Sequence, residues 1–244
     1  MAGMDYFLSL ASPAMCGASW WPLVVAYIVT FLVCGIPFGK IFARMLGKID
    51  LQKVGSGNIG TTNALRAGGP KVAVPTLICD VLKGVLGVNV IRLVVANMVN
   101  IDLADVLAIN GGAGIGDTLL AIAGLVCLCG HIFSPYLHFK GGKGIATGVG
   151  VLFGLSWPFA LLHLGIFIAV VALTRIVSLG SIVTVLALPL TVPLYFSGDS
   201  LSFKVIMSLL GLLVVWAHRS NVKKLLNGTE SKLSFTKRVK EMDE

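Results

Sequence analysis

Long apolar stretches separated by short polar segments dominate this chain from residue 20 to residue 217. A helix needs about 20 apolar residues to cross a bilayer, so each long stretch predicts a membrane-spanning helix. The expected spans are approximately Trp20–Leu46, Val72–Asn97, Asp117–Gly130, two helices within Ile145–Leu173, Leu179–Phe196 and Phe203–Ala217. Proline favours the first turn of a new helix, so Ser156-Trp157-Pro158 is expected to divide the fourth stretch into two helices. Pro189 and Pro193 are expected to kink or fray the sixth span.

The composition supports a membrane protein. The chain has 244 residues, a mean hydropathy of +0.92 and only 12% charged residues, whereas soluble domains carry roughly 25%. The apolar segments leave no room for a soluble domain of useful size. We therefore expect one all-α domain over residues 1–244, a polytopic membrane helical bundle with about seven transmembrane helices.

Lysine and arginine are distributed unevenly between the predicted loops. Seven spans place the two termini on opposite sides of the membrane, and basic loops remain on the cytoplasmic side. A cytoplasmic C-terminus gives that side nearly all of the 19 Lys and Arg residues, and leaves Lys204 and at most Arg92 outside. We expect residues 1–19 to lie outside the cytoplasm and residues 231–244 to form a cytoplasmic tail.

Three polar segments then share the cytoplasmic face: Gly55–Arg66, Gly130–Thr147 and His218–Glu230. Each is rich in Gly, Ser, Asn, Lys, Arg or His. Basic, glycine-bearing loops gathered at one membrane surface are typical of a site for anionic, phosphorylated molecules.

The first segment contains G-x-G-x-x-G, but a dinucleotide site needs a preceding strand, and here a membrane helix precedes it. Gly55 and Gly57 would let backbone N–H groups approach an oxyanion closely. Hydroxyl and amide side chains add further donors: Ser56, Asn58, Thr61, Thr62 and Asn63. Arg66 could bind a phosphate through two parallel hydrogen bonds. The alternative is a solvated, turn-rich loop.

The second segment carries Lys140-Gly141-Gly142-Lys143-Gly144, which resembles a phosphate-binding loop. It is not a Walker A sequence, because Gly144 rather than Ser or Thr follows Lys143 and no strand leads in. A helix that begins near Gly144 would present its amide-rich N-terminus to an anion.

In the third segment, His218 and Asn221 would share one face if the seventh helix continued. They offer hydrogen-bonding groups at the membrane surface. Binding of lipid headgroups is the alternative, and it would suffice for Arg219, Lys223 and Lys224.

Two smaller features also carry polar chemistry. Asp80 and Lys83 lie within the second span, where an internal ion pair is the favoured interpretation and a role at the substrate is the alternative. Ser178 and Ser181 are expected either to cap the sixth helix or to donate to a bound phosphate.

Several catalytic signatures are missing from the sequence. There is no H-x-x-x-x-D acyltransferase pair and no G-x-S-x-G elbow. No His, Cys, Asp or Glu cluster has metal-ligand spacing. We therefore expect no metal and no cofactor.

The three segments together resemble those of the bacterial acyl-phosphate:glycerol-3-phosphate acyltransferases, the PlsY family. The resemblance extends over about residues 37–230 and includes Asp80-x-x-Lys83-Gly84, Arg175-x-Val-Ser-Leu-Gly-Ser181 and Gly228-x-Glu230. It implies transfer of a fatty acyl group from acyl phosphate to the 1-hydroxyl of glycerol 3-phosphate, which gives lysophosphatidate and phosphate.

The same resemblance suggests the site residues and the location. Ser56, Arg66, His218 and Asn221 would be catalytic. Phosphate would be bound by Gly55, Gly57, Asn58, Thr62, Lys140, Gly141, Gly142, Lys143, Gly144, Ser178 and Ser181. The resemblance does not say which lysine has which role, nor whether His218 or a substrate phosphate oxygen is the base. The chain would lie in the bacterial inner membrane with its N-terminus periplasmic and its active site cytoplasmic.

The expected partners are the two substrates and membrane lipid, with no nucleic acid; the oligomeric state stays open. The alternative function is a transporter of phosphate or organophosphate anions. Inverted repeats and polar residues at the bilayer midplane are typical of transporters, and the sequence shows no repeat.

Overall fold

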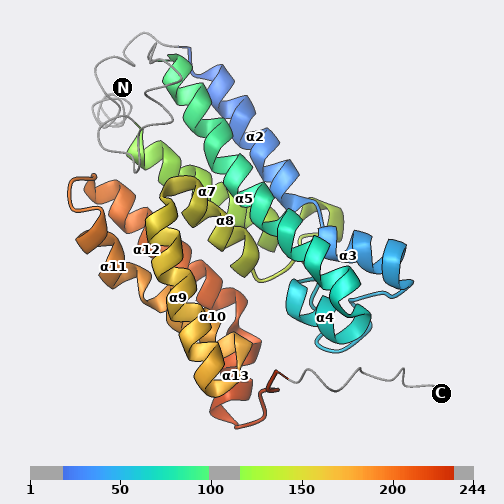
Figure 1. The fold of residues 1–244 in the computed structure, drawn as a ribbon. Coiled ribbons are helices and arrows are strands. Elements are labelled where there is room, and N and C mark those ends of the chain that lie inside the picture. The colour runs from blue at the N-terminus through green and yellow to red at the C-terminus, as the bar shows by residue number, and fades with distance from the viewer. Residues whose placement is uncertain (1–18, 99–115, 234–244) are drawn as a thin grey trace, which may run out of the picture.

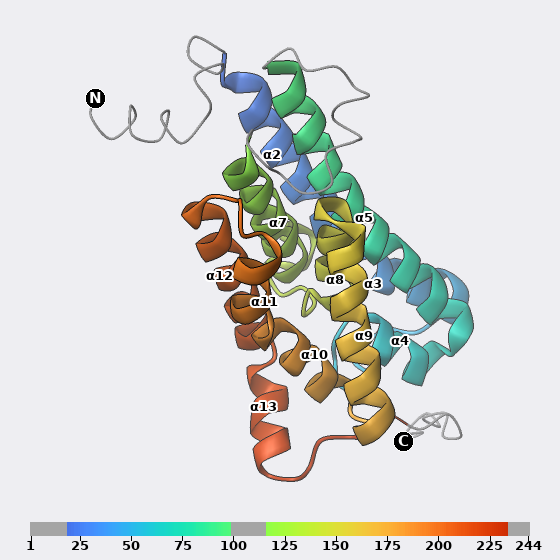
Figure 2. The ribbon, with the colours of Figure 1, turned by 60° about the vertical axis from the view of Figure 1, so that its left-hand side comes forward.

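The computed structural model describes residues 19–98 and 116–233, and every regular element in these two ranges is helical (Figures 1 and 2). The elements in chain order are α2 (Trp21–Gly35), α3 (Phe38–Phe42), the π-helical turn η2 (Ala43–Gly47), α4 (Thr61–Gly68), α5 (Pro70–Met98), α7 (Asp117–Ile132), the 3₁₀ turn η3 (Pro135–Leu137), α8 (Ile145–Leu155), α9 (Trp157–Thr174), α10 (Val177–Leu186), α11 (Leu188–Tyr195), α12 (Leu201–Ala217) and α13 (Arg219–Leu226). The predicted all-α class is confirmed for this part of the chain.

Two of the predicted proline effects are confirmed. The fourth apolar stretch divides at Ser156, where α8 ends and α9 begins with Pro158 in its first turn. The sixth stretch is bent by 44° between α10 and α11, and Pro189 lies in the first turn of α11. In both places the proline has no N–H to donate, so a new helix begins rather than the old one continuing.

The prediction of one continuous first helix over Trp20–Leu46 is wrong, because the helix is interrupted. The helix breaks after Gly35, because Ile36 precedes Pro37 and adopts an extended ψ of 121°, and the residue before a proline disfavours the helical region. The chain resumes in α3 and η2 and stops where Lys48 takes a left-handed φ of 53°. This break leaves the carbonyl of Ile36 inside the bundle, where it accepts a hydrogen bond from Lys83.

Two polar segments are more helical than the pattern indicated. The end of Gly55–Arg66 forms the first turns of α4. After α12 the chain does not continue straight, but bends by 62° into α13. His218 and Asn221 therefore lie at a corner between two helices instead of on one helical face.

Within the described residues, three helices are long and apolar enough to cross a membrane: Trp21–Gly47, counted across its break, Asp117–Leu137 and Trp157–Thr174. The two bent pairs, α10 with α11 and α12 with α13, raise the number to as many as five. Large apolar side chains cover the outside of these helices, among them Ile28, Leu162 and Leu212. An apolar exterior of this kind is what lipid tails would surround. Residues 99–115, between α5 and α7, lie outside the described ranges.

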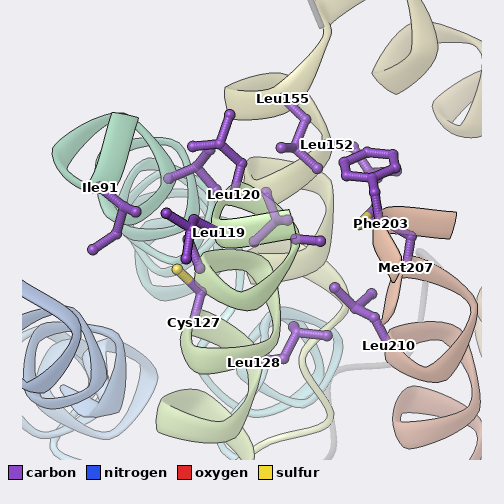
Figure 3. Close-up of a cluster of buried hydrophobic side chains, with 14 of the residues drawn as sticks. Ile91, Leu119, Leu120, Cys127, Leu128, Leu152, Leu155, Phe203, Met207 and Leu210 are labelled. Atoms are coloured by element: carbon purple, nitrogen blue, oxygen red, sulfur yellow. The ribbon is translucent and has the colours of Figure 1, made fainter. Parts of the chain in front are cut away.

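Helix α7 occupies the centre of the bundle and packs against α2, α5, α8 and α12. Buried side chains of α7 and of the helices around it form the core, including Ile91 of α5, Leu120 of α7, Leu152 of α8 and Met207 of α12 (Figure 3). In both ribbon views α3, α4 and α13 lie at one end of the bundle, and the start of α2 and the end of α5 lie at the other (Figures 1 and 2).

Candidate functional site

Asn63 organises the first glycine-bearing loop. Its side chain is buried, and its Nδ2 donates to the carbonyls of Leu51 at 3.1 Å, Val54 at 3.0 Å and Asn58 at 2.8 Å. Its Oδ1 accepts from the backbone N–H of Ser56 at 3.0 Å. The loop is therefore rigid, and Ser56 itself stays exposed at its surface.

Several backbone amides of this loop already have partners. The N–H of Gly57 donates to Val54 at 3.1 Å, and that of Gly60 donates to the Asn58 side chain at 2.8 Å. Gly55 is required by its left-handed φ of 61° and by the closeness of Asn63. These glycines shape the turn, and the amides of Ser56 and Gly57 are hydrogen-bonded within the loop; oxyanion binding by Gly55 and Gly57 stays a prediction. Thr62 follows in the first turn of α4, whose N–H groups have no earlier helical turn to bond to.

The second loop folds back on the end of α7. The N–H of Gly141 donates to Ile132 at 2.9 Å, and that of Gly142 donates to His131 at 3.1 Å. These two amides are therefore also hydrogen-bonded within the fold, and phosphate binding by Gly141 and Gly142 stays a prediction. Gly144, with a φ of 83°, caps α8, so the amides that remain for an anion are those of the first turn of α8.

Lys143 and Lys140 lie in different surroundings. The ammonium of Lys143 donates to Asn221 Oδ1 at 2.5 Å, and Asn221 Nδ2 donates to Glu230 Oε1 at 2.9 Å. Burial lowers the pKa of Lys143; the negative charge of Glu230 opposes this, and the positive charges of Lys224 and Arg66 add to it. The Lys140 side chain is exposed and makes no hydrogen bond to any described residue.

His218 lies at the corner between α12 and α13. Its Nδ1 is 2.8 Å from the carbonyl oxygen of Val214. A carbonyl only accepts, so Nδ1 carries the proton and Nε2 keeps its lone pair. Burial lowers the pKa of His218 to about 4, an effect that the Val214 carbonyl opposes and the charge of Lys143 strengthens. The carbonyl of His218 accepts from the N–H of Asn221 at 2.8 Å, which ties the two residues together.

The segment after α13 closes this arrangement. Arg66 Nη2 donates to the carbonyl of Ser231 at 3.5 Å, and the N–H of Leu233 donates to the carbonyl of Arg175 at 2.6 Å. Lys143 of the second segment thus bonds to Asn221 of the third, and Arg66 of the first segment bonds to Ser231, the residue that follows Glu230. We call Arg66, Lys143, His218, Asn221 and Glu230 the inter-loop cluster.

Glu230 was not assigned a role from the sequence, and Asn63 was expected only as one of several hydrogen-bond donors of the first loop. Glu230 is the carboxylate that accepts from Asn221, and its Oε2 is buried without a hydrogen-bond partner among the described residues. A single carboxylate at the end of a basic segment is the signal that could have indicated it. Only the residue type of Asn63 could have suggested that it organises the loop, because its four hydrogen bonds form only in the folded turn.

The two serines of α10 differ. Neither caps the helix, because the N-cap is Ile176, whose N–H donates to the Thr174 hydroxyl at 3.1 Å; the capping interpretation is wrong. Ser181 Oγ donates back to the Val177 carbonyl at 2.9 Å. Ser178 Oγ is buried without a hydrogen-bond partner in the described part of the chain. Ser178 is therefore the free hydroxyl of the pair.

No group of three or more His, Cys, Asp or Glu side chains capable of holding a metal ion occurs within residues 19–98 and 116–233. The chemistry of the inter-loop cluster is that of cations, amides and one carboxylate. Such groups bind and orient oxyanions without a metal.

Comparison with known proteins gives consistent results. Residues 24–228 match the family model described as glycerol-3-phosphate acyltransferase. Curated glycerol-3-phosphate acyltransferases are similar over nearly their whole length. That of Bartonella henselae is 37% identical over 207 residues, covering 85% of this chain and 90% of its own. That of Brucella anthropi is 38% identical over 211 residues, covering 86% and 93%.

Two solved structures are also similar. The glycerol 3-phosphate form of PlsY, an integral membrane glycerol 3-phosphate acyltransferase, aligns with a TM-score of 0.72 at 30% identity and covers 87% of this chain and 96% of its own. Its lysophosphatidic acid form aligns with a TM-score of 0.70 at 29% identity. The family match, the relatives and the fold agree, and the chain belongs to the glycerol-3-phosphate acyltransferase family.

Proposed function

We propose that this protein transfers a fatty acyl group from acyl phosphate to the 1-hydroxyl of glycerol 3-phosphate, releasing lysophosphatidate and inorganic phosphate. Family membership and the substrate and product forms of the similar structure support acyl transfer to glycerol 3-phosphate. The observation that carries the proposal is the hydrogen-bonded chain from Lys143 through Asn221 to Glu230, beside Arg66 and His218. Nothing in the described residues favours the transporter alternative.

Both substrates carry phosphate, and the inter-loop cluster supplies cations to bind it. We assign Arg66 and Lys143 to phosphate binding, together with Ser56, Thr62, Ser178 and the first turn of α8 after Gly144. Charge-assisted hydrogen bonds from these groups are roughly twice as strong as neutral ones. In this proposal Lys140 and Ser181 have lesser roles, because one is exposed and the other bonds within its own helix. Asn58 and the glycines Gly55, Gly57, Gly141 and Gly142 support the two loops.

The acyl transfer needs no acyl-enzyme. The 1-hydroxyl oxygen attacks the carbonyl carbon of acyl phosphate, the tetrahedral intermediate collapses, and the bond between the carbonyl carbon and the phosphate oxygen breaks. The protein supplies proximity and stabilises the oxyanion and the departing phosphate. Nε2 of His218 accepts a hydrogen bond from the attacking hydroxyl. The phosphate oxygen that is released when this bond breaks is a stronger base than His218, whose pKa is about 4, so the proton ends on the leaving phosphate.

The membrane arrangement belongs to the same proposal. Seven spans, with the N-terminus periplasmic and the C-terminus cytoplasmic, would place the inter-loop cluster at the cytoplasmic surface of the bacterial inner membrane. Acyl phosphate could then keep its chain among lipid tails while glycerol 3-phosphate arrives from the cytosol. Cysteine variants at the exposed positions Lys53, Lys140 and Lys224 should all react with an impermeant thiol reagent from one side only. Labelling of any one from the opposite side would exclude a shared site.

The reaction itself is tested by phosphate release. Purified protein in detergent should release phosphate from acyl phosphate only when glycerol 3-phosphate is present. Arg66→Ala should abolish most of this release, and Arg44→Ala, a cation on η2 outside the cluster, should not. Release that ignores glycerol 3-phosphate, or no release by the unmodified protein, would remove the proposal. Replacing acyl phosphate by acyl-CoA tests the donor.

A further inference from the structure

We infer that Asp80 and Lys83 are positioning residues that hold the two glycine-bearing loops at a fixed separation, which the two phosphate groups of the substrates require. The inference rests on the proposed function, and one of its two tests does not depend on catalysis. Neither residue belongs to the inter-loop cluster. Both lie in the middle of α5, and their charged atoms are 2.7 Å apart.

The pair is almost completely buried, with side chains 2% and 3% exposed. Removing two charges from water costs several kcal/mol per ion, and an apolar pair of similar size is often as stable. Stability alone therefore gives little reason for an ion pair at this depth. Each partner, however, reaches a different loop.

Lys83 reaches the first loop through α3. Its Nζ donates to the carbonyl of Ile36 at 3.1 Å and lies 5.6 Å from the centre of the Phe38 ring. Ile36 is the residue at which α2 breaks, and Lys83 therefore fixes the start of α3. Helix α3 in turn touches the first loop, because a Cβ at Gly39 would overlap the carbonyl oxygen of Ile59.

Asp80 reaches the second loop through His131. Asp80 Oδ1 lies 3.8 Å from Nδ1 of His131, a buried atom with no hydrogen-bond partner among the described residues. The carbonyl of His131 accepts from the N–H of Gly142. The imidazole also fills the space beside Gly142, where a Cβ would overlap Nε2.

One buried ion pair thus contacts the supports of both loops. If Asp80 and Lys83 became neutral, the Ile36 carbonyl would lose its cation and His131 its anion. Other contacts would still hold α5 in the bundle, among them the close packing of Gly84 against the carbonyl of Thr147. We expect the fold to survive while the two loops shift relative to each other. A displacement of about 1 Å in a reacting geometry can cost on the order of 100-fold in rate.

The test compares Asp80→Asn, Lys83→Met and the double variant. Each single change leaves one buried charge unpaired and should lower the melting temperature. The double variant should recover most of that loss, because neither charge remains. Its KM for glycerol 3-phosphate should nevertheless stay raised on the order of 10- to 100-fold. The matched control is Thr191→Val, which breaks a hydrogen bond to His163 far along the sequence from both loops. It should lower the melting temperature without changing KM.

Recovery of a normal KM together with the melting temperature in the double variant would overturn the inference, because the pair would then be merely stabilising. A raised KM in Thr191→Val would overturn it as well, because any loss of stability would then produce the effect.

A second measurement does not depend on catalysis. Spin labels at the exposed positions Lys53 and Lys140, in a background with the five native cysteines replaced by alanine, report the separation of the two loops. The distance distribution should shift or broaden in the double variant and stay unchanged in Thr191→Val. An unchanged distribution in the double variant contradicts the inference. If the unmodified protein released no phosphate, the proposed function would fail, but this distance would still decide the positioning role.

Discussion

Lys143 and Asn221, 78 positions apart in the chain, are joined by a hydrogen bond of 2.5 Å from the ammonium to the amide oxygen. Because Asn221 also donates its Nδ2 to Glu230, the orientation of the amide group is defined by its two partners. The bond fixes the entrance of α8 against the first turn of α13. Two of the three polar segments therefore meet through one side-chain contact. Lys143 makes this contact and Lys140 does not, so we expect the two lysines to have different roles.

Replacement of Lys143 by Met should reduce kcat/KM for glycerol 3-phosphate on the order of 100-fold or more, because a charge-assisted contact to phosphate is lost in the transition state. Lys140→Met is the matched control, since that side chain is exposed, and it should change kcat/KM only a few-fold. Steady-state phosphate release, with both substrates present, measures kcat/KM of the two variants. Equal losses in the two variants would contradict the assignment of Lys143.

The side-chain hydrogen bonds of Asn63 should stabilise the fold. Asn63→Ala removes four hydrogen bonds that hold the first loop. At about 0.5–1.5 kcal/mol each, the free energy of unfolding should fall by roughly 2–6 kcal/mol. Asn58→Ala removes the single bond from its side chain to the N–H of Gly60 and should cost much less. Thermal unfolding in detergent compares the two, and a smaller effect at Asn63 would show that the loop is held by something else.

The apolar helices and several of their breaks could be predicted from the sequence because they depend on local properties. Apolar length predicts a span, and Pro158 and Pro189 each begin a new helix irrespective of distant contacts. The break at Pro37 follows the same local rule. It was not predicted, because the apolar pattern continues through this position. The bend between α12 and α13 has no proline, so only the packing of the folded chain reveals it.

Residue types in the three polar segments indicated a phosphate site, but not which groups would be free to bind. Gly141 and Gly142 could have offered their amides, yet the turn uses both for His131 and Ile132. Ser178 and Ser181 were equivalent by sequence, and only one has a free hydroxyl. Hydrogen bonding within the fold determines which amides and hydroxyls remain free to bind a ligand, and it cannot be predicted from spacing along the chain.

His218 provides a test by pH. With a pKa of about 4, compared with an ordinary value of 6.5, His218 should be neutral at pH 6.5 with its proton on Nδ1. As the pH falls, the unfolded chain binds the proton first, so His218 should lower the stability of the fold progressively from pH 6.5 to about 4 and contribute nothing above 6.5. Nitrogen NMR of labelled histidine, with the signal assigned by its absence in His218→Gln, follows the titration. A midpoint at 6 or higher would contradict the buried, neutral ring.

Ser178 and Ser181 give a matched pair of variants within one helix. Ser178→Ala removes an unpartnered hydroxyl, and Ser181→Ala removes one that already bonds to Val177. If Ser178 donates to a substrate phosphate, its loss should raise KM for one substrate on the order of tenfold, with an unchanged melting temperature. Ser181→Ala should leave both KM values nearly unchanged. KM measured separately for acyl phosphate and for glycerol 3-phosphate identifies which phosphate is contacted, and a larger effect at Ser181 would reverse the assignment.

The crossing of α5 and α8 makes the last prediction, because the two helix backbones touch there. A Cβ at Gly150 would overlap the carbonyl of Val81 and approach the Cα of Gly84, and neither backbone atom can move aside as a side chain could. Gly150→Ala should therefore separate α5 from α8 and lower the free energy of unfolding by roughly 1–3 kcal/mol. Gly165→Ala in α9 is the control, since nothing lies within 4 Å of its added Cβ, and alanine is the better helix former by about 1 kcal/mol. Because α5 carries Asp80 and α8 begins at the second loop, Gly150→Ala should also reduce the affinity for glycerol 3-phosphate, as isothermal calorimetry can measure. A Gly150→Ala protein as stable as Gly165→Ala would show that the two helices are not in backbone contact.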